Sequence, residues 1–411
     1  MKKTVLNNGI KLKLVESPKT PRIALSMFFN FANQDNRPGL LSVLNRLLIQ
    51  GTKTRNSEEL AIELDENAIE FFAELKNDYL RIRLVCLNDD FEHAVEILED
   101  VIKNSTFENF EKEVEKLKGE LTAELDSAKA RAQDNYYNTI FGDHPYSFGS
   151  IKILNNIDNI SKEDVKEKYK DLLNTSIKNI CVVGDINSDE ITALLEKHFG
   201  DLPQGKNLPE YKIYTLNEDK VSVVEKEDAN QAQIHKGWIL PPINECDFHR
   251  FMLLNNILGA GGMTSRLFYE LREKKGLAYV VRSSLEANAE ASCFTVYIAT
   301  EPKNISTCIE GFKTEIDKIK TVLLTDEELE NAKNNLIGRR QFYYETNLLT
   351  ATLTGLHDLH GFSDDYEKEL VRKIENTTKE ELLEFAQKYF STPSALSVLA
   401  PSKFLVSAGL K

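Results

Sequence analysis

Residues 161 to 184 read SKEDVKEKYKDLLNTSIKNICVVG, and residues 378 to 401 read TKEELLEFAQKYFSTPSALSVLAP. The two segments match without a gap. Each opens with a hydroxyl residue that can cap a helix, Ser161 or Thr378, and has a carboxylate three residues later that can bond back to the cap backbone. Each then continues as an amphipathic helix, a turn and a β-rich apolar strand. This match indicates that one structural unit occurs twice in the chain.

A second pair of segments supports the duplication. VLNRLLIQG at 43 to 51 resembles LLNNILGAG at 253 to 261, and this pair is separated by nearly the same length of chain as the first. A domain-sized duplication explains both spacings, whereas chance similarity between helices does not fix a common one. We therefore expect two homologous domains, residues 1 to 202 and 219 to 411, joined by a linker at 203 to 218 that has the Pro and Gly content of a loop.

The pattern within each half predicts an α+β fold. In the first half, strands are expected near 4 to 15, 23 to 31, 67 to 75, 79 to 87 and 178 to 184, and most of the remaining chain has helical periodicity. Hairpin-like strand pairs that alternate with long helical segments are typical of a mainly antiparallel sheet with helices packed on one face.

The composition is that of a folded protein with no affinity for polyanions. Apolar residues make up 41% of the 411 residues and charged residues 28%, which is too apolar for a disordered chain. The net charge of -14, with no dense Lys/Arg cluster, argues against nucleic acid and anionic membranes as partners. The N-terminal lysines are not followed by an apolar segment of signal-peptide length, and no segment is long enough for a membrane helix, so we expect a cytoplasmic protein.

The five cysteines are not arranged as a metal site or a disulfide framework. They are odd in number, widely separated and form no C-x-x-C motif. They are Cys86, Cys181, Cys246, Cys293 and Cys308. We expect buried free thiols at these positions.

Several motifs together resemble those of the insulinase/pitrilysin metallopeptidase family. GLLSVLNRLLIQGTKTRNSEELA, which begins at Gly39, is similar to the segment in which that family carries H-x-x-E-H on a helix. HPYSFGS at 144 to 150, the helix and strand of 161 to 184, and MTSRLFYELREKKGLAY from Met263 match the same family in the same order. The resemblance covers nearly the whole chain and implies the duplicated fold of that family, which includes the mitochondrial processing peptidases.

The resemblance also implies that the zinc site has been lost. In the family, the two histidines of the motif ligate zinc and the glutamate activates the bound water. The matching positions here are Ser42, Asn45 and Arg46, none of which is an imidazole or a carboxylate. Glu124 matches the distant third ligand of the family, with Glu120 as a weaker match, and one carboxylate does not hold zinc. We expect no metal or cofactor in this chain.

Two interpretations of Arg46 remain open at the level of sequence. Its guanidinium can occupy the place of the metal, repel cations and form an ion pair with Glu124 across the vacated cavity. Alternatively, Arg46 points to solvent from a surface helix. Both interpretations remove catalysis by this helix.

The second half retains a pair of residues that the family uses on substrate. Arg272 and Tyr279, seven residues apart in the segment LREKKGLAY, match an arginine and a tyrosine that reach the substrate backbone near the scissile bond. Arginine N–H groups and a tyrosine hydroxyl suit polarisation of a peptide carbonyl. The alternative is a helix-end arginine beside a strand tyrosine that is packed in the core.

Three other motifs carry weaker signals. His357 and His360 form the only close histidine pair, but a helix-end cap or a surface polar patch is favoured over a metal site. His144 precedes a proline, and we expect it to make a local hydrogen bond in a turn. The glycines of LGAGGMTSRLF lack the Lys-Ser/Thr ending of a P-loop, so we expect close packing at a helix start, with Thr264 or Ser265 as its cap.

Three classes of function fit these observations. We favour an inactive subunit that dimerises with a homologue bearing H-x-x-E-H. In this hypothesis that partner alone holds zinc, and this chain contributes Arg272 and Tyr279 to a shared peptide-binding chamber. Self-association of this chain is the other partner arrangement that the sequence leaves open. Loss of the first-half motif together with retention of the second-half pair favours this hypothesis. The alternative is a scaffolding subunit of a larger assembly. A peptidase with an unrecognised site is least favoured, because the sequence has no Ser-His-Asp or Cys-His signature. We expect the chain to be inactive alone.

Overall fold

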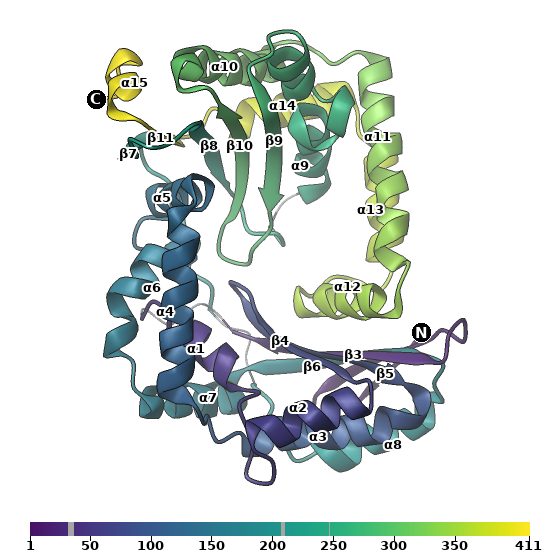
Figure 1. The fold of residues 1–411 in the computed structure, drawn as a ribbon. Helices are drawn as coiled ribbons and strands as arrows, with labels where there is room; N and C mark the ends of the chain where they lie inside the picture. The colour runs from purple at the N-terminus through teal and green to yellow at the C-terminus, as the bar shows by residue number, and fades with distance from the viewer. Residues whose placement is uncertain (32–36, 207–209, 246) are drawn as a thin grey trace. The chain divides into compact units, whose positions relative to one another are not determined.

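The computed structural model describes residues 1–31, 37–206, 210–245 and 247–411 (Figure 1). Contacts divide the chain into two compact units. Unit 1 consists of Met1–Glu120, Lys152–Glu210 and Gln341–Asp364, and unit 2 consists of Leu121–Ile151, Tyr211–Arg340 and Asp365–Lys411. Each unit therefore combines segments from both halves of the sequence. Where one sequence repeat ends and the next begins stays a prediction.

Unit 1 contains a six-stranded sheet in the order β1-β2-β6-β3-β5-β4. Its strands are β1 (Lys2–Val5), β2 (Lys11–Glu16), β3 (Arg22–Asn30), β4 (Glu70–Leu75), β5 (Tyr79–Leu87) and β6 (Ile177–Gly184). Only β2 and β6 pair in parallel; the other neighbours are antiparallel. Its helices are α1 (Leu40–Leu47), α2 (Ser57–Glu66), α3 (Phe91–Asn104), α4 (Phe110–Asp126), α6 (Ser150–Asn156), α7 (Lys162–Thr175), α8 (Ser188–Phe199) and α12 (Asn347–Leu359), of which α4 and α6 continue across a unit boundary.

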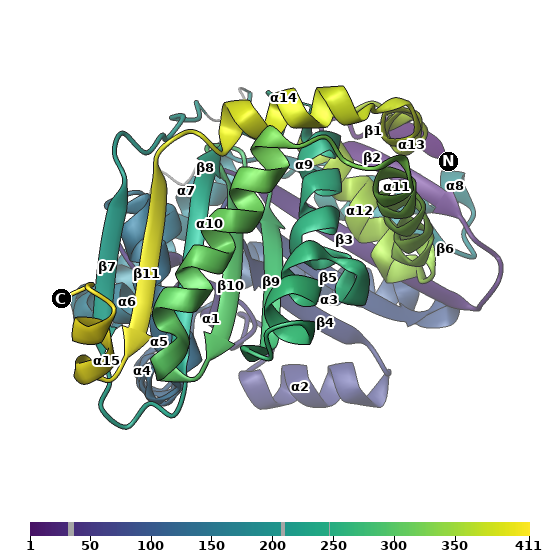
Figure 2. The same ribbon diagram turned by 90° about the horizontal axis from the view of Figure 1, so that it is seen from above.

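Unit 2 contains a five-stranded sheet in the order β7-β11-β8-β10-β9. Its strands are β7 (Lys220–Glu225), β8 (Ala232–Leu240), β9 (Ala278–Glu286), β10 (Ser292–Thr300) and β11 (Ser394–Ala400), with only β7 and β11 parallel. Its helices are α5 (Ala128–Phe141), α9 (Phe248–Asn255), α10 (Ile305–Thr321), α11 (Asp326–Gln341), α13 (Tyr366–Asn376), α14 (Lys379–Tyr389) and α15 (Ser402–Ser407), together with π-helical turns at Asn256–Ala260 and Phe268–Glu273. Figure 2 shows α10 crossing the face of this sheet. The predicted α+β fold with two mainly antiparallel sheets is confirmed.

The duplicated capping motif forms as predicted at both positions. The Ser161 hydroxyl accepts the Asp164 N–H at 3.1 Å, and the Asp164 carboxylate accepts the Ser161 N–H at 2.8 Å. Thr378 and Glu381 form the same reciprocal pair at the start of α14. Hydrogen bonds from Ser161, with a contribution from Arg37, lower the pKa of the Asp164 carboxyl to about 2. Both equivalent helices therefore begin where the sequence predicts.

One helix covers the second face of each sheet, which the sequence pattern did not predict. The central strands β3 and β10 are buried at nearly every position, so side chains of both faces lie in the interior. In unit 1 the other face is covered by α12, which lies across β3 and β6. In unit 2 it is covered by α5, which lies across β8 and β11. Each covering helix comes from the opposite half of the sequence.

Two glycines allow these helices to approach their sheets. A Cβ atom at Gly355 of α12 would lie 2.3 Å from the ring of Phe28 on β3. Asn179 of β6 donates a hydrogen bond of 2.9 Å to the Gly355 carbonyl. In unit 2, Gly237 of β8 provides the same space for Tyr136 of α5, whose hydroxyl would lie 1.9 Å from a Cβ at that position. Both contacts require the absence of a side chain.

We expect Gly355→Ala to destabilise the protein by about 1 to 3 kcal/mol, because the added methyl group overpacks against Phe28. Gly338→Ala in α11 is the matched control, since a Cβ there meets nothing within 4 Å. The control should be neutral or stabilising by up to about 1 kcal/mol from helix propensity. Urea unfolding of both variants measures the difference. Equal stability of the two variants would show that α12 is not tightly packed on the sheet.

His235 is a titratable residue of β8 that contacts α5 through Tyr136. It lies on β8 between the rings of Tyr136 and Tyr297, with centroid distances of 5.1 and 4.6 Å. The residue is only 6% exposed. Burial, helped by the positive charges of Arg282 and Lys129, lowers the pKa of His235 to about 3. The folded protein therefore keeps this imidazole neutral at neutral pH.

This burial predicts a specific dependence of stability on pH. A lowered histidine pKa stabilises the folded state fully above the unfolded pKa of about 6.5, and the contribution is lost as pH falls from that value toward 3. Between pH 7 and 5, wild type should lose about 2 kcal/mol more unfolding free energy than His235→Phe, which keeps an aromatic ring but takes up no proton. Urea unfolding at both pH values tests this, and identical pH dependence of the two proteins would contradict it.

The four cysteines that the structure describes, Cys86, Cys181, Cys293 and Cys308, are buried and unpaired, as predicted. Burial raises the pKa of both Cys181 and Cys293 to about 12, so their thiols are poor nucleophiles. Cys246 lies outside the described residues. Across the described ranges, no helix has the length and apolar character needed to cross a membrane.

Candidate functional site

Helix α1 presents the three positions that match the zinc motif. The helix follows Gly39, whose φ of 93° places it in the left-handed region, and it buries Leu40, Val43, Leu44 and Leu47 against the core. This apolar stripe fixes the rotation of the helix. The intervening positions Ser42, Asn45 and Arg46 are consequently only partly buried.

Arg46 binds two glutamates of α4. Its Nη1 and Nη2 atoms donate to the two carboxylate oxygens of Glu120 at 2.7 and 2.9 Å, and its Nε donates to Glu113 at 3.3 Å. The side chain of Glu113 is 5% exposed, that of Arg46 25% and that of Glu120 60%. The hydrogen bond with Glu120 raises the pKa of Arg46 and lowers that of Glu120. The guanidinium is therefore held in one orientation by a bidentate pair and a third bond.

The prediction that Arg46 pairs with Glu124 is wrong, because Arg46 pairs with Glu113 and Glu120 instead. Glu124 instead accepts a hydrogen bond from Ser150 at 3.1 Å. Glu113 and Glu120 lie seven residues apart, which is two turns along one face of α4, and the fork of one guanidinium spans both. Helical periodicity could have identified Glu113, but only the packing of α1 on α4 selects between Glu120 and Glu124. The interpretation of Arg46 as a solvated surface residue is also wrong.

The residues of this site do not fit zinc. Zinc needs deprotonated nitrogen, sulfur or oxygen ligands, and a serine, an asparagine and a guanidinium do not supply them. The two carboxylates that are present, Glu113 and Glu120, are already bonded to a fixed positive charge. Among residues 1–31, 37–206, 210–245 and 247–411, no group of three or more His, Cys, Asp or Glu side chains has a metal-binding arrangement.

The structure brings Arg272 and Tyr279 together in unit 2. Arg272 lies in the π-helical turn Phe268–Glu273, and Gly276, with a φ of 60°, turns the chain into β9. Arg272 Nη1 donates to the carbonyl of Tyr279 at 2.6 Å. The guanidinium carbon lies 4.7 Å from the ring centroids of both Phe268 and Tyr279. Tyr279 is 77% exposed, so the alternative of a tyrosine packed in the core is wrong. Sequence reasoning missed Phe268.

The histidine pair at the end of α12 belongs to a helix terminus. Burial, with a smaller effect of His357, lowers the pKa of His360 to about 4. His360 is the C-terminal cap, and Gly361 follows with a φ of 71°. Between the histidines, Asp358 binds the buried Lys13 with an N to O distance of 3.2 Å. The favoured helix-end interpretation agrees with this geometry.

His144 makes the predicted local hydrogen bond and one more. Its Nδ1 accepts the Tyr146 N–H at 3.2 Å, a bond that spans Pro145 and caps the short helical turn Pro145–Ser147. Its Nε2 lies 2.7 Å from the buried carboxylate of Glu290. Because Nδ1 is an acceptor, the proton is on Nε2 and is donated to Glu290. The bond to Glu290 joins residues far apart in sequence, and no local pattern predicts it.

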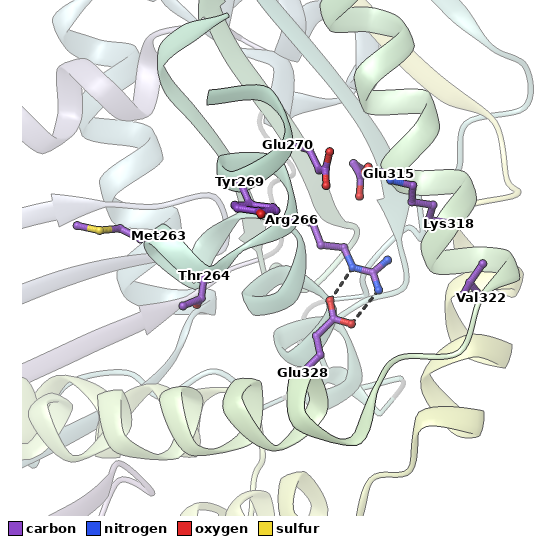
Figure 3. A pocket seen from close by; sticks show the side chains of 9 residues that line it. All are labelled: Met263, Thr264, Arg266, Tyr269, Glu270, Glu315, Lys318, Val322 and Glu328. Carbon is purple, nitrogen blue, oxygen red and sulfur yellow. Dashed lines mark hydrogen bonds and ion pairs between the residues drawn. The ribbon is translucent and has the colours of Figure 1, made fainter. Parts of the chain in front are cut away.

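The glycine-rich segment packs closely, as expected, but the hydroxyls of Thr264 and Ser265 donate to the carbonyls of Gly261 and Gly262 and do not form the expected cap. A Cβ at Gly259 would lie 2.2 Å from the Ser283 nitrogen of β9. Beside this segment lies a cavity of about 760 Å³ whose lining is shown in Figure 3. Its two cations are paired with carboxylates: Arg266 donates to both oxygens of Glu328 at 2.6 and 2.9 Å, and Lys318 binds Glu315 at 2.6 Å. This pairing does not favour a phosphate ligand.

Comparison with known families settles the classification. Residues 15–150 match the model of insulinase (peptidase family M16), and residues 159–336 match the peptidase M16 inactive domain, which together is more than half of the chain. The chain belongs to the M16 family. The insulinase/pitrilysin resemblance predicted from the sequence is confirmed.

Individual M16 proteins are similar over the whole chain. An uncharacterized zinc protease of Rickettsia felis is 26% identical, covering 97% of each chain, and one of Bacillus subtilis is 23% identical, covering 98% of each. A protease from Helicobacter pylori has a TM-score of 0.87 at 22% identity, covering 97% of this chain and 99% of that one. The peptidase M16 inactive domain from Pseudomonas fluorescens has a TM-score of 0.85 at 21% identity, covering 98% of each. These structures share the fold.

We predict that the purified protein holds no stoichiometric zinc. Arg46 is already bonded to the carboxylates of Glu113 and Glu120, and Ser42 and Asn45 supply no metal ligand. Elemental analysis of protein produced in zinc-supplemented medium and then dialysed checks this. A content of about one zinc per chain after dialysis would contradict our interpretation of the M16 motif positions.

Proposed function

We propose that this chain is a non-catalytic subunit of a two-chain M16 peptidase. A homologous partner with an intact H-x-x-E-H motif supplies the zinc, and this chain supplies Arg272 and Tyr279 to bind and polarise the peptide. The observation that carries the proposal is the contrast between the two sites. The matching positions of α1 hold an arginine bound to glutamates, whereas Arg272 of the π-helical turn stays in contact with the exposed Tyr279 of β9.

The geometry of Arg272 suits a substrate-binding role. The guanidinium is held between two aromatic rings, so its orientation is restricted before any ligand arrives. One of its N–H groups donates to the Tyr279 carbonyl. A guanidinium has five N–H donors. Its Nε lies 4.0 Å from the exposed carboxylate of Glu273, and the Nη atoms carry further N–H groups that can donate to a peptide carbonyl or carboxylate. The exposed hydroxyl of Tyr279 adds a donor at the same place.

The division of labour also agrees with the family comparison. The segment that matches the M16 inactive domain, residues 159–336, is the one that carries both Arg272 and Tyr279. In a peptidase, the scissile carbonyl must be polarised by hydrogen-bond donors while the water is activated elsewhere. This chain has groups for the first task, and the part of it that the structure describes holds no set of metal ligands for the second. We therefore expect the partner to perform the attack on the peptide.

With a zinc-bearing M16 partner, Tyr279→Phe and Arg272→Lys should each lower peptide turnover by about 10- to 1000-fold, the range for loss of one transition-state donor. Assembly of the two chains should be unchanged. Tyr269→Phe is the matched control, because Tyr269 is also exposed, at 52%, and a lysine also lies over its ring. Turnover of the co-expressed complex and its elution on size-exclusion chromatography provide the measurements.

Two results would contradict the proposal. If Tyr279→Phe assembles with the partner and cleaves at the unmutated rate, the chain has a scaffolding role in the complex. If this chain alone cleaves peptides in the presence of a chelator, it is not a non-catalytic subunit.

A further inference from the structure

Arg46 connects two helices that a metal connects in the zinc-bearing members of the family. In the resemblance described above, two ligands lie on the helix that corresponds to α1 and one lies on a later helix, so the ion links two elements of the chain. Here the guanidinium of Arg46 links α1 to Glu113 and Glu120 of α4. We propose that Arg46 replaces the metal as the structural cross-link between α1 and α4.

The charge balance supports this substitution. Glu113 and Glu120 carry two negative charges. Arg46 contributes one positive charge that contacts both carboxylates from α1, and Lys116 adds a second positive charge at 2.6 Å from the other oxygen of Glu113. Two carboxylates facing two unit charges have the same balance as two carboxylates facing a divalent ion. Glu113 is nearly fully buried, and a buried carboxylate is costly unless it is paired.

The length of α1 makes the cross-link important. The helix has eight residues, just over two turns, and an isolated helix of that length is not stable. Its apolar stripe packs against the core, and Arg46, on the flank of that stripe, binds α4. A lysine at this position could hold one carboxylate oxygen but could not fork across Glu120 while donating to Glu113. The planar guanidinium is therefore the suitable replacement for an ion with several ligands.

The proposal predicts a latent cation site. If the guanidinium is removed, the two carboxylates that it contacted remain, one of them buried, with Lys116 paired to Glu113. Oxygen ligands of this kind bind hard divalent cations such as Mn²⁺ and Ca²⁺. A cation should then restore the link that the arginine provided. The unmodified protein should not respond, because Arg46 already occupies the carboxylates.

The experiment compares melting temperatures of the full-length protein in EDTA and in millimolar MnCl₂. Wild type should melt at the same temperature in both. Arg46→Met should melt about 4 to 10 °C lower in EDTA and regain at least about half of that loss with Mn²⁺. Combining Arg46→Met with Glu113→Gln should remove the recovery, because one of the two carboxylates is gone. Isothermal titration with MnCl₂ should give binding to Arg46→Met only.

The matched control is Arg266→Met in unit 2. Arg266 forms a similar bidentate pair, but with the single carboxylate of Glu328, and the neighbouring Glu315 is already bound to Lys318 (Figure 3). This variant should show no recovery with Mn²⁺. If Arg46→Met is too unstable to purify, Glu120→Gln provides a milder test. It removes the charge of the fork partner and keeps Glu113 paired, so it should lower the melting temperature without creating a cation site.

Three results would overturn the proposal. The cross-link is absent if Arg46→Met or Glu120→Gln melts at the wild-type temperature in EDTA. The arginine does not stand in for an ion if Arg46→Met is destabilised but neither binds nor recovers with Mn²⁺. The carboxylates are not occupied by Arg46 if wild type itself is stabilised by Mn²⁺. None of these measurements depends on a peptidase partner, so they remain distinguishable from a failure of the proposed function.

Discussion

The need to bury both faces of each sheet is the constraint on which the fold depends. Strands β3 and β10 have apolar side chains pointing to both sides, so a layer of helices on one face leaves the other exposed to water. Helices α12 and α5 cover the exposed faces, and both do so with buried residues at the same spacing along the helix. Each buries every fourth residue, Ala351 and Gly355 with Leu359 in one, and Ala132 and Tyr136 with Ile140 in the other. Because each covering helix comes from the opposite half of the sequence, neither half contains a complete unit.

At both sites that match M16 motifs, the central group is an arginine whose guanidinium is held in place by its neighbours. In unit 1, the Arg46 guanidinium is bound by two carboxylates and is unavailable to a ligand. In unit 2, Arg272 packs against two aromatic rings, and its nearest carboxylate contact is a long one of 4.0 Å to the exposed Glu273. An arginine thus has a structural role at position 46, whereas the arginine at position 272 is suited to binding a ligand. The difference lies in the partners. Arg46 is hydrogen-bonded to two carboxylates, whereas Arg272 contacts two rings, a backbone carbonyl and one carboxylate at 4.0 Å.

The site could be predicted in part from the sequence. The order of motifs located Ser42, Asn45 and Arg46, and it located Arg272 and Tyr279 as a pair. It could not identify Phe268, because an aromatic residue before an arginine in a helix is an ordinary pattern and only the π-helical turn brings the ring against the guanidinium. It also favoured Glu124 as the partner of Arg46. Glu120 and Glu124 lie one turn apart on α4, and sequence spacing alone does not distinguish them.

The sequence by itself determined the family, the duplicated order of elements, the capped starts of α7 and α14, and the absence of a zinc ligand from α1. These features depend on residue identity and on local periodicity, which act over one or two helical turns. Tertiary structure alone decided which helix covers which sheet, that His144 bonds Glu290, and that Arg46 binds Glu113 and Glu120. Those contacts join residues distant in the chain. They follow from the depth to which α5 and α12 pack and from the relative positions of α1 and α4, which are properties of the assembled core.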